Sequence, residues 1–167
     1  MKLVILFLFA FLFISCNSNN KGRDYSYKSN GLIYKKGTNE LFTGKIIDTL
    51  NVIIEFEVVK GKKNGEFKTT YLNGNTEKVG FIKNNYNEGE WKYYYPDGKI
   101  ESIGLFKKNR PNGLWTCYFD NGKIKSKGRY KLGMEDGFWK HYDKTGKLTE
   151  YYYYKNGLMI NLIFKVG

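Results

Sequence analysis

The chain has 167 residues and a formal net charge of +12, from 28 Lys and Arg against 16 Asp and Glu. A basic balance of this size can indicate nucleic-acid binding, but the lysines are spread along the chain instead of gathered in one run, and the joint abundance of Lys, Asn, Ile and Tyr is what an AT-rich genome produces. Nucleic acid is therefore not an expected partner. The two cysteines predict no internal disulfide, because the first lies in the N-terminal signal described next.

Residues 1–15 are predicted to be a signal peptide. Met1-Lys2 is a short basic start, and the apolar run from Leu3 to Ile14 is too short for a membrane span, which needs about 20 residues. The run ends in Phe13-Ile14-Ser15-Cys16, which resembles a bacterial lipobox, although Phe13 replaces the usual Leu. We expect lipidation of Cys16. The alternative is an ordinary signal peptide cut near Ser15, with Cys16 an incidental thiol.

Residues 16–29 are polar and show no apolar periodicity, so they are expected to form a flexible tether after the lipidated Cys16. About 135 residues then remain, which is the size of one domain. Residues 30–43 are predicted to be an N-terminal capping hairpin, in which residues 32–34 and 40–43 flank a turn at residues 36–39.

From residue 44 the sequence repeats with a period of 24 residues. The predicted units are 44–64, 65–88, 89–112, 113–136 and 137–160, followed by a C-terminal capping strand at 161–167. The alternative for this last apolar strand, residues 158–166, is an edge that adheres to another strand. We call a set of residues that recurs at this 24-residue step a column. Three columns are glycine, one is aromatic and one is lysine: Gly65, Gly89, Gly113 and Gly137; Phe67, Trp91, Trp115 and Trp139; Gly74, Gly98, Gly122 and Gly146; Gly80, Gly104 and Gly128; and Lys83, Lys107, Lys131 and Lys155.

Each unit reads as an antiparallel β-hairpin. Residues 90–95 are rich in aromatic side chains, which favour strands. Residues 96–99 supply turn chemistry, residues 100–107 form the return strand, and residues 108–112 are expected to turn the chain into the next unit. The predicted fold is all-β: an elongated single-layer stack of hairpins with about 24 residues per repeat.

Stacking is expected to bury the Trp column, since an isolated hairpin cannot bury enough apolar surface to be stable. The Trp rings should pack against Ile82, Phe106, Tyr130 and Tyr154 of the return strands. The Gly80, Gly104 and Gly128 column either lets a ring lie across bare backbone or marks a bulge. The spacing of Trp91 and Tyr94 implies a bulged strand or two partly covered faces.

The unit GEWKYYYPDGKIESIGLFKKNRPN (residues 89–112) resembles the MORN repeat variant of bacterial proteins. The resemblance extends over residues 44 to about 160 and implies a repeat surface with no catalytic residues. Members of that family include proteins labelled antitoxins and envelope lipoproteins. Choline- and glucan-binding repeats are a second resemblance, with a period nearer twenty.

The sequence offers no catalytic, cofactor or metal site. Cys117 and His141 occupy the same column in adjacent units, but equivalent positions should lie two strands apart, roughly 9–10 Å, whereas a nucleophile and its base need about 3 Å. The candidate for function is a surface of aromatic and basic side chains. Its members are Tyr93, Tyr95, Tyr118, Phe119, Tyr142, Lys92 and Lys140.

We therefore expect a non-enzymatic, lipid-anchored protein of the bacterial cell envelope whose repeat surface binds or scaffolds a protein partner. Two alternatives remain open. One is an immunity or antitoxin protein that neutralises a toxin, and the other is a glycan-binding module. The expected contacts are the membrane, through the lipid, and an envelope protein, a toxin or a glycan.

Overall fold

The computed structural model describes residues 23–165. The predictions for the signal peptide, for lipidation of Cys16 and for the first part of the tether fall outside these residues. Residues 23–165 contain no candidate for a helical membrane span.

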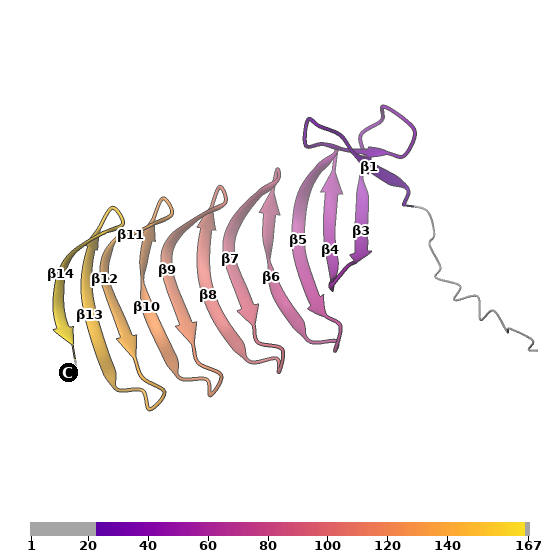
Figure 1. Cartoon of the computed structure of the whole chain (residues 1–167). Helices are drawn as coiled ribbons and strands as arrows, with labels where there is room; N and C mark the ends of the chain where they lie inside the picture. Colours follow the sequence, from indigo (N-terminus) through magenta and orange to yellow (C-terminus); the bar gives the residue numbers. More distant parts are fainter. Residues whose placement is uncertain (1–22, 166–167) are drawn as a thin grey trace, which may run out of the picture.

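One open antiparallel sheet contains nearly all of the described chain (Figure 1). Its strands pair in chain order from β3 at one edge to β14 at the other, and the short β11 pairs only with β10. The strands are β1 (Tyr25–Tyr27), β2 (Ile33–Lys35), β3 (Gly44–Thr49), β4 (Val52–Val59), β5 (Lys62–Tyr71), β6 (Thr76–Lys83), β7 (Tyr86–Tyr94), β8 (Ile100–Lys107), β9 (Arg110–Tyr118), β10 (Ile124–Lys131), β11 (Met134–Glu135), β12 (Gly137–Tyr142), β13 (Leu148–Lys155) and β14 (Leu158–Lys165). The predicted all-β, single-layer stack of hairpins is confirmed.

The turns differ at the two ends of the strands. One end of the sheet carries the turns that contain Gly74, Gly98, Gly122 and Gly146, and we call it the Asp-Gly end after Asp97-Gly98. There, Tyr95 N–H donates to the carbonyl of Lys99 (2.8 Å), and Gly98 takes a φ of +86° that favours glycine. At the other end the turn is tighter than predicted. Only Lys108 and Asn109 leave the ladder, with φ of +48° and +65°, because a two-residue turn in this left-handed conformation matches the twist of its strands. The expected link over residues 108–112 is therefore wrong beyond Asn109, since Arg110 already begins β9.

The segment before the repeats also differs from the prediction. Residues 25–27, expected in the tether, form β1 and pair with β2. The Tyr25 ring packs against Phe42 at 5.9 Å between centroids, and its hydroxyl donates to Asp48 (3.4 Å), so this polar stretch contains an aromatic anchor that its composition hides. The expected hairpin of residues 32–34 with 40–43 is reduced to one isolated bridge between Tyr34 and Leu41.

The first repeat strands and this leading segment share the main apolar cluster. Ile33, Ile46, Phe56 and Val58 are each at most 4% exposed. Ile33 N–H donates to the carbonyl of Gly61 (2.9 Å), which fixes the leading segment over the turn between β4 and β5. From this cluster, aromatic contacts continue along the sheet: Phe56 packs against Phe67, and Phe67 packs against Trp91.

A register shift resolves the question raised by Trp91 and Tyr94. Tyr93 lies opposite Ser102, whereas Tyr94 lies opposite Ile100, so Glu101 is an extra residue on the return strand β8. The strand β7 itself alternates normally there, and Trp91 and Tyr94 lie on opposite faces of the sheet.

Candidate functional site

Aromatic rings form a continuous row along one face of the sheet, which we call the aromatic face. Trp91 contacts Phe106 (5.9 Å between ring centroids), and Phe106 contacts Trp115 (5.4 Å). Tyr130 then links Trp115 to Trp139, at 5.9 and 5.0 Å. Every ring is thus braced by rings from neighbouring strands, and the three tryptophans of the column line up as the repeat predicts.

The glycines of the return strands make room for these rings. A Cβ atom on Gly104 would overlap the ring of Trp115, and one on Gly80 or Gly128 would overlap Trp91 or Trp139. These glycines have ordinary extended backbone, so the requirement is for space and not for a special φ. Of the two explanations given for this column, a ring lying across bare backbone is the one observed.

A groove opens on the aromatic face between two repeats. Tyr93, Tyr95 and Trp115 supply rings to it, and its volume is about 230 Å³. Glu101, Ser102, Cys117, Tyr118 and Lys125 complete the lining. Ser102 is 9% exposed and lies opposite both Tyr93 and Cys117, because β8 runs between β7 and β9. The groove therefore has an aromatic and hydroxyl floor, with one acidic and one basic side chain among its walls.

The pKa values of two groove tyrosines, Tyr93 and Tyr95, are raised. Burial raises the pKa of Tyr93 above its ordinary value of 10.0. Burial is also the main reason that the pKa of Tyr95 is raised, with a further contribution from the charge of Glu101. The Tyr95 hydroxyl donates to the carbonyl of Tyr118 (2.7 Å), which orients its ring along the groove.

In a comparison with protein families, residues 87–108, 111–132 and 135–156 each fit the model described as "MORN repeat variant". These residues carry MORN-variant repeats. The first two matched segments start one residue into the long strands β7 and β9, and the third starts in the short β11 just before β12. Each ends at the next tight turn, so each is one hairpin of the sheet.

No curated protein matches the chain. Among solved structures, TarM is similar at a TM-score of 0.32 and 11% identity, and a mutant of S. aureus TarM in complex with Fondaparinux, alpha-GlcNAc-glycerol and UDP is similar at 0.32 and 10%. Each comparison covers 72% of this chain and 21% of the other. The chain thus spans about a fifth of the length of those proteins, and similarity this low supports no functional argument.

Cys117 and His141 are separated by a strand, as the repeat geometry predicts. Ser126 on β10 lies opposite Cys117 on β9 and opposite His141 on β12. Two strand spacings amount to roughly 9–10 Å, so the thiol and the imidazole of these MORN-variant repeats do not form a nucleophile and base pair. The His141 ring instead contacts Trp139 and Tyr152 in the aromatic row, at 6.5 and 5.6 Å.

Within residues 23–165, no group of three or more His, Cys, Asp and Glu side chains is placed to hold a metal ion. The aspartates of the turns are hydrogen-bonded within those turns. Asp143 accepts from Thr145 N–H (2.8 Å) and Lys147 N–H (3.0 Å), and Asp97 accepts from Lys99 N–H (3.1 Å). They form the turns of the repeats.

The structure separates the predicted aromatic and basic surface into three places. Tyr93 lies on the aromatic face, where it contacts Trp91 and Trp115, and Tyr95 and Tyr118 lie with it around the groove. Lys92 and Lys140 follow Trp91 and Trp139 directly and so point to the opposite face. Lys140 lies over the ring of Tyr151 there (5.1 Å), and Lys92 pairs with Glu90 (3.2 Å).

The remaining two members of the predicted surface, Phe119 and Tyr142, lie at the Asp-Gly end of the strands. Lys144 lies over the ring of Phe119, 6.0 Å from its centroid. Tyr142 ends β12 and pairs with Leu148 at the start of β13. The seven residues therefore do not form one stripe. Tyr93 and Tyr95 share the groove, whereas Tyr118 lines the groove and also a hollow that contains Leu114 and Thr116. Sequence reasoning did not identify Ser102, although serine recurs at Ser126 at the 24-residue step.

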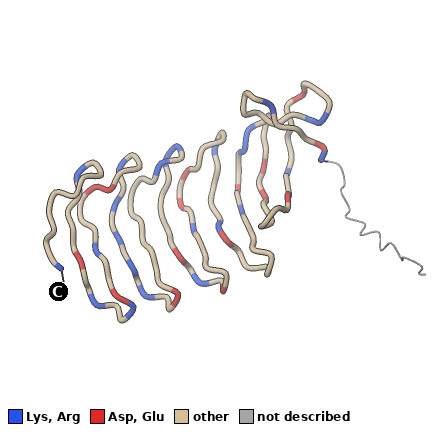
Figure 2. The backbone as a smooth tube through the Cα atoms, viewed as in Figure 1, with Lys and Arg blue, Asp and Glu red and all other residues tan. Residues whose placement is uncertain are grey.

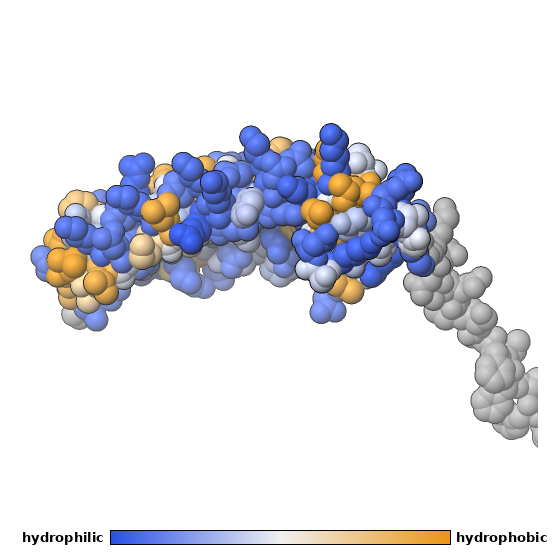
Figure 3. All heavy atoms as spheres, turned by 90° about the horizontal axis from the view of Figure 1, so that it is seen from above, coloured by the Kyte–Doolittle hydropathy of each residue, from blue (hydrophilic) through white to orange (hydrophobic). Residues whose placement is uncertain are grey.

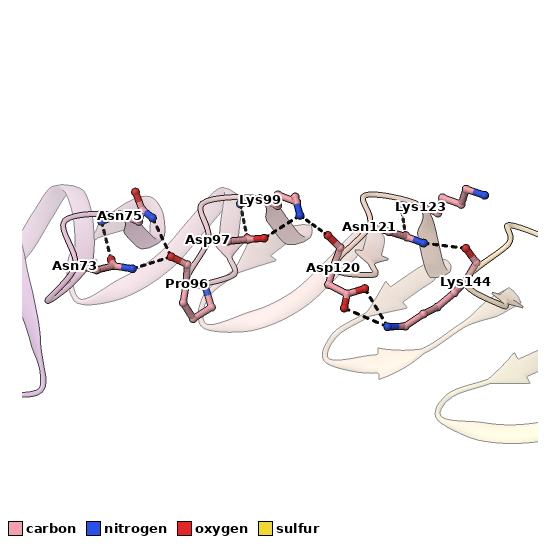
Figure 4. A network of polar contacts seen from close by, with 9 residues as sticks. All are labelled: Asn73, Asn75, Pro96, Asp97, Lys99, Asp120, Asn121, Lys123 and Lys144. Atoms are coloured by element: carbon pink, nitrogen blue, oxygen red, sulfur yellow. Dashed lines mark hydrogen bonds and ion pairs between the residues drawn. The ribbon is translucent and has the colours of Figure 1, made fainter.

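A polar ladder connects the turns at the Asp-Gly end (Figure 4). Asn73 and Asn75 both donate to the carbonyl of Pro96 in the next repeat (2.8 Å each). Further along, Lys99 Nζ donates to the carbonyl of Asp120 (2.9 Å), and Asn121 donates to that of Lys144 (2.9 Å). These bonds use side chains that the repeat provides at every turn, so they fix the spacing of the hairpins independently of the aromatic row.

Charges of both signs recur along the whole sheet (Figure 2). Lysines appear in every hairpin and not in a single basic tract, as the sequence indicates. At the Asp-Gly end, Lys99 pairs with Asp97 (2.9 Å) and Lys144 with Asp120 (3.1 Å). Much of the basic charge there is thus engaged within the repeats.

Proposed function

We propose that this chain is an exported, lipid-anchored protein of the bacterial cell envelope that binds a protein partner through its repeat surface and catalyses no reaction. The observation that supports a binding role best is the groove of Tyr93, Tyr95 and Trp115 on the aromatic face. Tyrosine and tryptophan are the side chains that most often anchor protein partners, and polar rims surround such anchors.

The size of the groove favours a partner's side chain over a whole metabolite. Small-molecule sites measure about 300–1,000 Å³ and enclose most of their ligand, whereas this groove measures about 230 Å³ and is open along the sheet. Glu101 and Lys125 at its walls are both exposed and give a partner one charge of each sign to complement. A peptide segment or loop carrying an apolar anchor would fit these features.

Affinity capture from detergent-solubilised envelopes tests the proposal. The bait is the full chain, and the variant Lys125→Glu reverses a charge at the groove without touching its rings. Lys92→Glu is the matched control, because it makes the same change on the opposite face. We expect a stoichiometric protein to be captured by the wild type and by Lys92→Glu and to be lost with Lys125→Glu. Equal capture by all three would contradict a role for the groove.

The identity of the captured protein separates scaffolding from immunity. Structural envelope proteins would support scaffolding, whereas a single toxin would support an immunity role in which the same surface blocks the toxin. In that second case, deletion of the protein should leave cells healthy unless the toxin is expressed.

A glycan-binding role is the alternative that the rings of the groove favour, since flat aromatic rings also stack on sugars. Elution of the bait by a soluble saccharide, without any captured protein, would support it. Saccharide elution of the Lys92→Glu and Lys125→Glu variants adds a second comparison. A sugar held by stacking on the rings should be less sensitive to the charge at position 125 than a protein partner is.

The anchor is proposed from the lipobox-like residues 13–16. Two or more acyl chains hold a protein stably at a membrane, whereas one holds it only marginally. Mass spectrometry of the mature N-terminus should show the acyl-derived mass on Cys16, and a Cys16→Ser variant should lack it. An unmodified Cys16 would leave the binding role intact but remove the anchor.

A further inference from the structure

The last strand, β14, is an apolar edge that nothing in the described chain covers. All eight residues of Leu158–Lys165 are exposed. Leu158, Met159 and Ile160 are 57–69% exposed, and Leu162, Ile163 and Phe164 are 44–46% exposed. Figure 3 shows this gathering of hydrophobic side chains at the end of the molecule opposite the grey N-terminal trace. The expected capping strand therefore ends the stack without covering its apolar side chains.

An edge strand offers unpaired backbone N–H and C=O groups to any second strand, and proteins usually protect such edges with charges, bulges or covering segments. The opposite edge, β3, is protected in this way. It carries Lys45, which pairs with Glu55 (2.7 Å), and Asp48, which pairs with Arg23 from the leading segment (2.9 Å). β14 has two bulges against β13, at Ile160 and Ile163, but it has no covering segment in the described chain, and its only charged residue is Lys165 at its end, paired with Glu150 (3.6 Å).

We propose that β14 pairs antiparallel with β14 of a second copy of this chain, which joins two sheets into one continuous sheet with a two-fold axis. A head-to-tail contact would have to use the protected edge β3 and would grow without end, whereas pairing of identical edges closes after two copies. The proposal requires neither the lipid anchor nor the groove.

The sequence of β14 is compatible with pairing to itself. The two-fold axis of such a pair must pass through a residue position, because residues directly opposite each other in an antiparallel ladder project to the same face. An arrangement centred on Leu162 places Leu162 opposite Leu162 of the second copy, with the other apolar side chains of the strand on either side. It also places the two Lys165 side chains at opposite ends, roughly 20 Å apart at about 3.4 Å per residue. Their repulsion is therefore screened.

Pairing would bury only part of the exposed apolar surface of β14, because side chains of a single-layer sheet stay partly exposed even on interior strands: Leu114 on β9 is 54% exposed. The area buried by the six large apolar side chains is therefore below the roughly 1,200 Å² of standard interfaces, and main-chain hydrogen bonds between the two β14 strands supply much of the contact. Phe138 extends the same apolar end, since it is 52% exposed and contacts Tyr151 and Tyr153 on the face opposite the aromatic row.

The protein mass of the full chain in detergent, from light scattering combined with absorbance and refractive index, tests the proposal. We expect two chains per complex for the wild type and one for Leu162→Lys. Leu114→Lys is the control: it introduces the same charge at an exposed leucine (54%) on the interior strand β9, and should keep two chains. A single chain in the wild type at micromolar concentration, a series of ever larger assemblies, or no effect of Leu162→Lys would overturn the proposal.

A second measurement does not depend on a destabilising charge. In a Cys117→Ser background, Leu162→Cys should form a disulfide between two copies on mild oxidation, because position 162 lies next to the two-fold axis. Leu114→Cys should form none. The pairing is wrong, and β14 contacts lipid instead, if two results occur together. The first is that Leu162→Cys does not cross-link, and the second is that the Leu162→Lys variant sediments less with phosphatidylglycerol vesicles than the wild-type protein does.

Discussion

The ring of Trp115 on β9 covers Gly104 on β8 so closely that a Cβ atom at position 104 would overlap it. The same relationship joins Trp91 to Gly80 and Trp139 to Gly128. The sheet is a single layer, so it cannot bury its tryptophans between two layers. It buries them against the bare backbone of the neighbouring strand instead, and Trp91 and Trp139 are only 3% and 4% exposed.

Gly104→Ala should destabilise the protein by at least about 2 kcal/mol, because the added methyl group forces the Trp115 ring or the backbone to move. The measurement is urea unfolding followed by circular dichroism. In a Trp115→Ala background the same substitution should cost much less, since the overlapping ring is gone. Equal costs in the two backgrounds would mean that the glycine is needed for another reason.

Trp91→Phe should cost less stability than Trp139→Phe, although both remove the same atoms. Trp139 Nε1 donates to the carbonyl of Arg129 (3.1 Å), whereas Trp91 Nε1 is buried without a partner. Removing a buried N–H that has no partner recovers part of its desolvation cost, and removing one that is bonded leaves a carbonyl unsatisfied, so the difference should be about 1 kcal/mol. Chemical unfolding of both variants measures it. The reverse order would show that the Trp91 N–H finds a partner in solution.

Asp120→Asn should change stability by less than about 1 kcal/mol, because its ion pair with Lys144 is exposed on both sides. Asn121→Ala should cost more, since Asn121 donates to the carbonyl of Lys144 and accepts from Lys123 N–H. Any effect of Asp120→Asn should disappear at high salt, whereas that of Asn121→Ala should persist. Thermal unfolding at low and high salt distinguishes the two contributions to the ladder.

Ser126→Cys should form a disulfide with Cys117 under oxidising conditions, since the two positions are directly opposite on adjacent strands and within the span of a disulfide. His141→Cys should not form one with Cys117, because Ser126 lies between them. Peptide mapping by mass spectrometry detects the linked peptides. A linkage between position 141 and Cys117 would show that the register of β10 is wrong.

Stability should fall as the pH rises above 10. Burial raises the pKa of Tyr93 and Tyr130 in the folded state above the ordinary value of 10.0. Below pH 10 both states keep these hydroxyls protonated. Above it the unfolded chain loses the protons first, so folding is increasingly disfavoured until the folded hydroxyls ionise as well. In Tyr93→Phe the fall should be shallower. Tyr86→Phe, whose ring is half exposed, serves as the control and should follow the wild type. Urea unfolding at a series of pH values gives the comparison.

Much of the fold was predictable from the repeat. The 24-residue step fixes the hairpins, the Trp column and the glycine columns, because a single-layer sheet has to provide each ring with the same neighbour in every unit. The same step placed Cys117 and His141 two strands apart, which the register confirms. Wherever one rule acts in every unit, the sequence alone was sufficient.

The parts that the sequence did not determine involve contacts between segments or a choice of face. Tyr25 joins the fold because Phe42 and Asp48, far along the chain, receive its ring and hydroxyl. The groove depends on the extra residue Glu101 and on Tyr93 and Cys117 meeting across Ser102, whereas Lys92 and Lys140 point to the other face. The period counts residues and so predicts the strands. Which side chains share a surface is decided by the register of the strands and by long-range packing, and these follow from the assembled sheet.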